Sequence, residues 1–187
     1  LYRGTAVGYQ VYEEGALVAA LGKPDTDWPF RMGVLGVLRV LHGDPARREG
    51  WLDVGRAVPL EAFRAALAEA APGLVVESYG RMHSCMLRGA TDDLYVSAIE
   101  VLLEMRTALC LLNGRWVTHD YLEGILEAAA FSLVPEGYAR LAPALWRERH
   151  AAPALALADE LVAGYRRLLE REGVPVRDAQ SVDDLDL

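Results

Sequence analysis

Several features that mark other protein classes are scarce or missing in this 187-residue sequence. It has two cysteines, Cys85 and Cys110, both in apolar, helix-like stretches, which argues against a disulfide framework and fits a reducing compartment. No apolar run approaches the roughly 20 residues of a membrane span, and no signal peptide is evident. Cys-x-x-Cys, G-x-S-x-G and glycine-rich phosphate loops are also missing. We therefore expect a cytoplasmic protein without a membrane span.

Acidic residues outnumber basic residues in this chain. Lysine and arginine total 19 against 27 aspartates and glutamates, which gives a formal net charge of -8. No basic stripe with interleaved aromatic residues occurs, so we expect no nucleic-acid partner. Net negative charge commonly keeps a protein soluble. Carboxylates that line a cleft can also attract a polycationic ligand, but the charge by itself favours the first interpretation.

The pattern of apolar residues changes at about Pro45. Before it, residues 5–12 and 34–42 have the β-branched and aromatic content of strands, and residues 13–21 between them predict a helix ended by Gly22. Beyond it a helical period dominates. We expect helices at 46–57, 60–71, 74–88, 91–112 and 118–130, a short one from 135, and a last one at 151–172.

These elements predict an α+β fold that is mainly α. A remnant of a sheet is followed by an up-and-down helical bundle. We expect three parts: an incomplete α/β portion at residues 1–44, a helical bundle domain at 45–174, and an acidic tail at 175–187.

The strongest candidate for chemistry lies in the helix at 77–88. There Glu77, Arg81 and Arg88 fall on roughly one face, and Glu77 four residues before Arg81 is the favourable order for an ion pair. Such a pair is usually a solvated contact that contributes roughly a few tenths of a kcal/mol. Alternatively, the carboxylate is a general base and the cation holds a phosphate. Gly80, which is unfavourable inside a helix, indicates close approach of another chain or a ligand.

Two further groups of polar residues could bind a metal ion. Asp25 and Asp27 form a D-x-D pair that could hold Mg²⁺ beside substrate phosphates, but their proline-flanked setting favours a turn. His119 and Asp120 have no further ligands at fitting spacing, and we expect them in the first turn of a helix capped by Thr118. The sequence therefore predicts no metal site within this chain.

Four segments together resemble a known enzyme family. They are DWPFRMG at 27–33, VVESYGRMH at 75–83, ILEAAAFSLVPEGYARL at 125–141 and ELVAGYRRLLEREGV at 160–174. Their order and spacing are similar to those of the aminoglycoside (kanamycin) nucleotidyltransferases, and the resemblance covers residues 6–174. The collinearity of the segments carries this resemblance, because no single motif is decisive.

The resemblance implies an activity and a set of partners. Enzymes of this family confer antibiotic resistance by transferring a nucleoside monophosphate from ATP or another nucleoside triphosphate, with Mg²⁺, to a hydroxyl of a polycationic aminoglycoside. They combine a nucleotidyltransferase domain with a helical bundle, and they are homodimers whose active site lies between subunits. The family's general base falls on Glu77, and a lysine that contacts phosphate falls on Arg81. Asp27 falls in a stretch that borders the antibiotic cleft.

The chain departs from the family pattern at its N-terminal end. The family's G-S…D-x-[D/E] motif, which holds the metal, is missing, and Gly8 stands where a further acid is expected. One interpretation is a transferase whose metal-binding N-terminal segment is absent from this chain. The other is a catalytically degenerate relative that serves as a ligand-binding or protein-interaction module. We favour the first. A helical partner in a toxin–antitoxin pair fits less well, because the Arg115-to-His119 spacing is one residue short of the expected ribonuclease motif.

Overall fold

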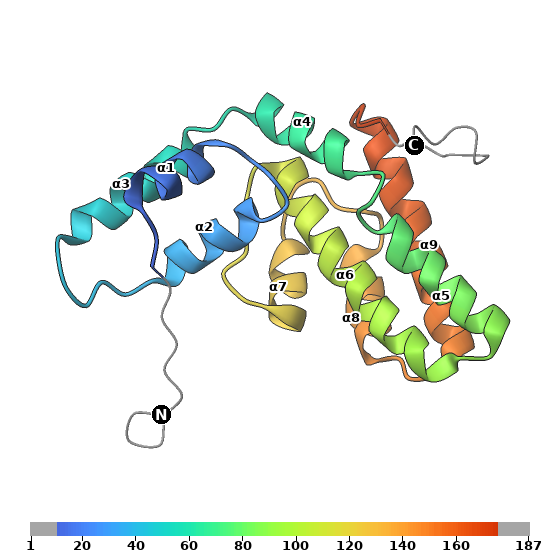
Figure 1. Cartoon of the computed structure of the whole chain (residues 1–187). Coiled ribbons are helices and arrows are strands. Elements are labelled where there is room, and N and C mark those ends of the chain that lie inside the picture. The colour runs from blue at the N-terminus through green and yellow to red at the C-terminus, as the bar shows by residue number, and fades with distance from the viewer. Residues whose placement is uncertain (1–10, 176–187) are drawn as a thin grey trace, which may run out of the picture.

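The computed structural model describes residues 11–175, and within them the chain forms helices and no strand. The elements are α1 (Glu14–Gly22), α2 (Trp28–Val37), α3 (Pro45–Arg56), α4 (Leu60–Ala70), α5 (Val76–Arg88), α6 (Thr91–Asn113), α7 (Tyr121–Ala128), α8 (Tyr138–Arg147) and α9 (Ala151–Arg171). Helices α1 to α3 lie together at one side, and α4 leads from them to the remaining helices (Figure 1). None of the described helices combines the length and apolar character needed to cross a membrane.

The expected sheet remnant is wrong for the residues described. The segment 34–42, predicted as a buried strand, forms the end of α2 and an irregular connection to α3. Trp28, Met32 and Leu35 are buried at a helical spacing of four and three residues, so α2 packs one stripe inward instead of alternating faces. The strand expected at 5–12 falls almost wholly outside the described residues, as do Gly8 and the acidic tail beyond residue 175.

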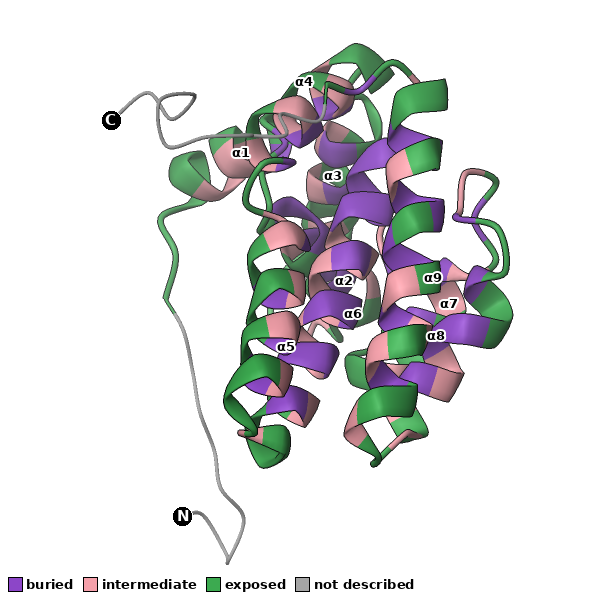
Figure 2. Cartoon of the chain, turned by 90° about the vertical axis from the view of Figure 1, so that its right-hand side faces the viewer, coloured by how far each residue is buried: buried purple, intermediate pink, exposed green. Residues whose placement is uncertain are grey.

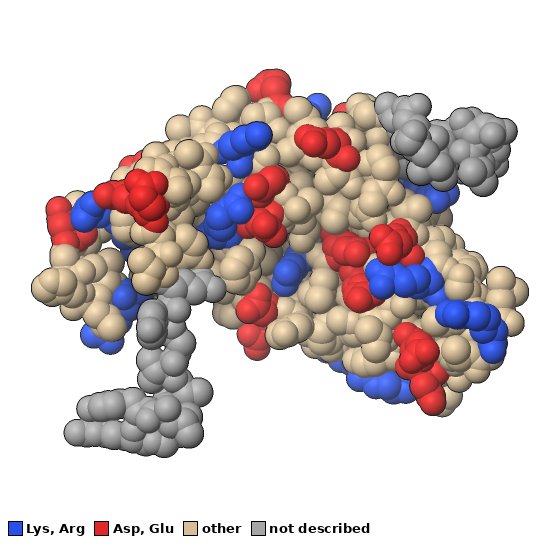
Figure 3. Space-filling view, viewed as in Figure 1, with Lys and Arg blue, Asp and Glu red and all other residues tan. Residues whose placement is uncertain are grey.

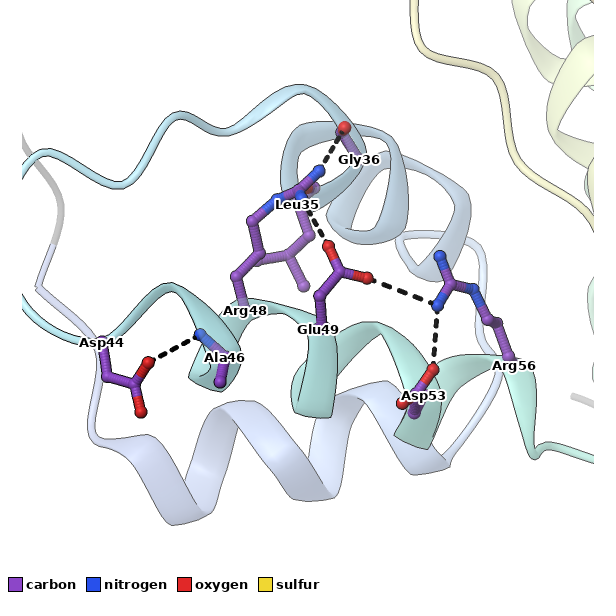
Figure 4. A network of polar contacts seen from close by, with 8 residues as sticks. All are labelled: Leu35, Gly36, Asp44, Ala46, Arg48, Glu49, Asp53 and Arg56. Carbon is purple, nitrogen blue, oxygen red and sulfur yellow. Dashed lines mark hydrogen bonds and ion pairs between the residues drawn. The ribbon is translucent and has the colours of Figure 1, made fainter.

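An arginine from α3 explains why α2 can end where it does. Arg48 donates from Nε to the Leu35 carbonyl at 2.8 Å and from Nη2 to the Gly36 carbonyl at 2.6 Å (Figure 4). Carbonyls in the last turn of a helix lack partners within the helix, and a cation suits that end of the helix dipole. Glu49 holds the same guanidinium through Nη1 at 2.6 Å. The carbonyl groups at the end of α2 are therefore satisfied by a residue ten or more positions later in the chain.

Helix α6 forms the centre of the molecule. It contacts α2, α4, α5, α7, α8 and α9, and its apolar side chains are buried along nearly its whole length. The buried faces of the surrounding helices turn toward it, while the exposed residues lie outside (Figure 2). A helix that is apolar on most sides belongs in the core of a bundle. The predicted helical bundle is therefore confirmed.

One tryptophan joins the first helices to this bundle. Trp28 in α2 is fully buried, and its indole Nε1 donates to the Leu21 carbonyl at 2.8 Å. Its ring meets Phe63 of α4 edge-on at 4.6 Å between centroids, and Trp116 at 5.9 Å. The described part of residues 1–44 is thus helical and shares one buried core with the rest. The boundary at residue 44 stays a prediction.

Candidate functional site

The first turn of α5 carries the pair predicted for chemistry. Glu77 is in this turn with its side chain 75% exposed, and its Oε1 lies 3.8 Å from Arg81 Nη2. Arg81 is also held from α6, because Glu100 Oε2 lies 3.3 Å from its Nη1. Its Nη2 donates to the Ser78 hydroxyl at 3.1 Å. Acidic and basic side chains gather over α5 and α6 on this face (Figure 3). The structure thus brings one arginine between two carboxylates.

A third carboxylate, Glu104 of α6, fixes the start of α5. Its Oε2 accepts the Val75 amide at 3.0 Å, and its Oε1 accepts the Ser78 hydroxyl at 2.9 Å. Val75 has a φ of 74°, an unfavourable conformation for a β-branched residue, directly before the helix begins. The first amides of a helix have no partner within it, so the oxygen acceptors of Glu104 stabilise this end of α5. Glu104 therefore positions the turn that carries Glu77. Spacing along the chain did not identify Glu104, and an acid among the buried apolar residues of α6 was the available signal.

Glu104 should also make stability depend on pH. Burial raises the pKa of this carboxyl, while its two hydrogen bonds oppose the shift. With a folded pKa above the unfolded value, its stabilisation is present below the unfolded pKa and is lost as pH rises through the folded pKa. We expect the free energy of unfolding of the wild type, relative to Glu104→Gln, to fall as pH rises from about 4 toward 7. Urea unfolding of both proteins across this range measures the difference. A pH-independent difference would contradict it.

A further polar group ties α5 to α9. The Tyr79 hydroxyl donates to Asp159 Oδ1 at 2.7 Å, and His83 Nε2 lies 3.2 Å from the same oxygen. The two rings meet edge-on at 4.7 Å between centroids. Burial, with the hydrogen bond to Asp159, raises the pKa of Tyr79 to about 12, so this phenol stays protonated and donates throughout the physiological range. These contacts hold the helix that carries Glu77 and Arg81 in a fixed orientation.

The D-x-D residues form a turn around an arginine. Arg31 pairs with Asp25, and its Nη1 lies 3.9 Å from Asp27 Oδ2. The Asp27 amide donates to Asp25 Oδ1 at 2.9 Å. The Asp27 side chain is 82% exposed, and α2 does not contact α5. The structure therefore does not bring Asp27 against Glu77. Within residues 11–175, no group of three or more histidine, cysteine, aspartate or glutamate side chains could hold a metal ion.

A second site is a cavity of about 130 Å³ between α2, α6 and the loop before α7. Its apolar wall comes from α2, and its polar wall comes from α6 and the loop. The lining residues are Thr26, Pro29, Phe30, Gly33, Val34, Val37, Arg106, Thr107, Val117, Thr118, His119 and Asp120. Neither Glu77 nor Arg81 belongs to it.

Two glycines allow the loop at 117–120 to lie against its neighbours. A Cβ on Gly33 would fall far inside contact with the Val117 carbonyl oxygen, and one on Gly124 would do the same with the His119 carbonyl oxygen. Only a residue without a side chain permits such approach. Tyr121, at the start of α7, has a φ of 50°, an outlier for an aromatic residue and of the kind that gathers at functional sites.

Glu127 of α7 holds the loop from the other side. It accepts the Thr118 amide at 2.8 Å and pairs with His119 Nδ1 at 3.2 Å. Burial opposes ionisation, yet these bonds from Thr118 and His119 lower the pKa of Glu127 and keep it a carboxylate. The expected helix cap at Thr118 is wrong. Helix α7 begins at Tyr121, and Thr118, His119 and Asp120 lie in the loop.

No protein-family model matches the sequence. No curated protein matches it either.

Proposed function

We propose that this chain is the acceptor-binding, helical part of a nucleotidyltransferase-like protein. In this role the carboxylates of α5 and α6 bind a polycationic, aminoglycoside-like acceptor, and Glu77 serves as the general base. The observation that carries the proposal is the exposed Glu77 carboxylate with Arg81 one helical turn away, flanked by Glu100. A carboxylate open to solvent can reach a hydroxyl of a bound ligand, whereas a buried one cannot.

Glu77 and Arg81 are assigned two roles, removal of a proton and neutralisation of a negative charge. Glu77 takes the proton of the acceptor hydroxyl, and the hydroxyl oxygen forms a bond to the α-phosphorus of the nucleoside triphosphate. The bond from that phosphorus to the pyrophosphate oxygen breaks, and pyrophosphate leaves. Arg81 neutralises negative charge that develops on the transferred phosphate. The described residues do not fit Mg²⁺, so no step here passes through a metal.

The test is a nucleotidyl-transfer assay on the protein expressed from its natural start codon, with Mg²⁺, ATP and a panel of aminoglycosides. We expect transfer, and we expect Glu77→Gln to lower it at least about a hundredfold, because general-base catalysis contributes about 10²–10⁴-fold. The matched control is Glu61→Gln, which changes an exposed glutamate in the first turn of α4 and should leave the rate unchanged. Retained transfer in Glu77→Gln would remove this residue as the base.

A second candidate function is ligand binding without catalysis. It is favoured by the state of Arg81, whose guanidinium already contacts Glu77, Ser78 and Glu100, so a phosphate would have to displace these partners. Together Glu77, Glu100 and Glu104 outnumber Arg81, and this surplus of carboxylates suits a polycation. Kanamycin binding by calorimetry, without transfer in the same preparation, would favour this function. The homodimer implied by the resemblance stays a prediction.

A further inference from the structure

Arg106 is a cation without an ion-pair partner among residues 11–175. It belongs to α6 and lines the cavity together with residues of α2. Its Nη1 is buried and has no hydrogen-bond partner, and no ion pair joins Arg106 to a described residue. Arg31, Arg48 and Arg81, on other helices, all have such partners. A half-buried guanidinium without an anion is costly, so this geometry favours a ligand that supplies one.

The wall of the cavity that α2 forms is apolar. Phe30, Val34 and Val37 form its α2 wall and are exposed by 62%, 43% and 62%. They follow each other at helical spacing, so they form one apolar strip beside the arginine. A ligand that satisfies both walls needs an anionic end and an apolar body. A bare inorganic anion would leave the strip uncovered.

We propose that this cavity binds a small organic acid, whose carboxylate pairs with Arg106 and whose apolar body packs on Phe30 and Val34. Planar carboxylates match the fork of a guanidinium, which can form two parallel hydrogen bonds to them. The site lies away from Glu77, and the proposal goes beyond the proposed function and does not rest on it.

The neighbouring charges set how strongly the acid binds. Asp120 lines the same cavity, is exposed, and makes no side-chain bond as the N-cap of α7. Its negative charge opposes a carboxylate. Glu127 is occupied by Thr118 and His119. Removing the charge of Asp120 should therefore strengthen binding, and removing that of Arg106 should weaken it.

The experiment is an NMR titration of the full chain with benzoate, using the backbone amides of Gly33, Val117 and His119 as reporters. Benzamide has the same shape without the charge, and inorganic phosphate has the charge without the apolar ring. We expect benzoate to shift these amides and both other probes to bind at least about tenfold more weakly. Arg106→Met should weaken benzoate by about tenfold or more. Asp120→Asn should strengthen it a few-fold.

The controls separate binding from folding. Arg88→Met makes the same change on the exposed end of α5 and should leave benzoate affinity unchanged. Should Arg106→Met unfold, Val34→Glu replaces an exposed residue of the apolar wall with a repelling charge and should abolish binding in a folded protein. Any one of four results would overturn the proposal: no shift at the three amides, equal binding of benzamide, a preference for phosphate, or full affinity in a folded Arg106→Met or Val34→Glu variant.

Discussion

Trp28→Ala is expected to lower the free energy of unfolding by about 3–5 kcal/mol, the usual cost of emptying a buried aromatic site. The ring is fully buried and packs edge-on against Phe63 and Trp116, so its removal leaves a cavity where α2, α4 and the loop after α6 meet. It also leaves the buried Leu21 carbonyl without its indole donor. For a chain of this size the melting temperature should fall by roughly 10 °C.

Urea unfolding, followed by circular dichroism, measures this loss. Trp28→Phe is the matched control, because it keeps an aromatic ring in the site and removes the hydrogen bond to Leu21. We expect it to cost about 1–3 kcal/mol, clearly less than alanine. A loss below about 1 kcal/mol for Trp28→Ala would show that the first helices do not depend on this contact for their attachment.

The second large effect is a reversal of the usual rule for glycine in helices. Replacing glycine with alanine within a helix normally stabilises it by about 0.5–1 kcal/mol. At Gly33 of α2 the new methyl group would collide with the Val117 carbonyl oxygen, a backbone atom that cannot rotate away. Overpacking of this kind costs about 1–3 kcal/mol, so Gly33→Ala should destabilise the protein.

Gly80→Ala supplies the comparison within the same molecule. Gly80 lies inside α5, is exposed, and has no atom within 4 Å of the place where a Cβ would stand. This substitution should raise the free energy of unfolding by about 0.5–1 kcal/mol. The two variants should therefore shift the urea midpoint in opposite directions. Equal shifts would mean that the loop at Val117 yields freely to α2. The close approach that the sequence suggested for Gly80 is not made by the described residues of this chain.

Local signals predicted the helices well from α3 onward. Proline and glycine near the ends and a 3.6-residue apolar period are enough to place helices such as α3, α5 and α9 to within about two residues. The same method failed at 34–42, where β-branched and apolar residues fit a strand and a buried helix equally well. What separated the two was Arg48, which closes the carbonyl end of α2 from another helix.

The candidate sites likewise contain some residues that local spacing predicts and others that only packing brings together. Glu77 and Arg81 were identified because i and i+4 positions on a helix always lie side by side, whatever surrounds them. Glu100 follows Arg81 by 19 residues and Glu104 follows Ser78 by 26, so only packing reveals that both meet the start of α5. The placement of Asp27 away from Glu77 was equally invisible to spacing along the chain.

The sequence by itself determined an acidic, largely helical chain with an amphipathic bundle and with Glu77 and Arg81 one turn apart on a helix, since periodicity and local order are properties of neighbouring residues. The tertiary structure alone decided that α2 is a helix, that three carboxylates surround the start of α5, and that Arg106 lines a cavity beside an apolar strip with no ion pair to any described residue. The reason is physical. Burial and the pairing of distant polar groups depend on which surfaces meet, and a local pattern does not specify that.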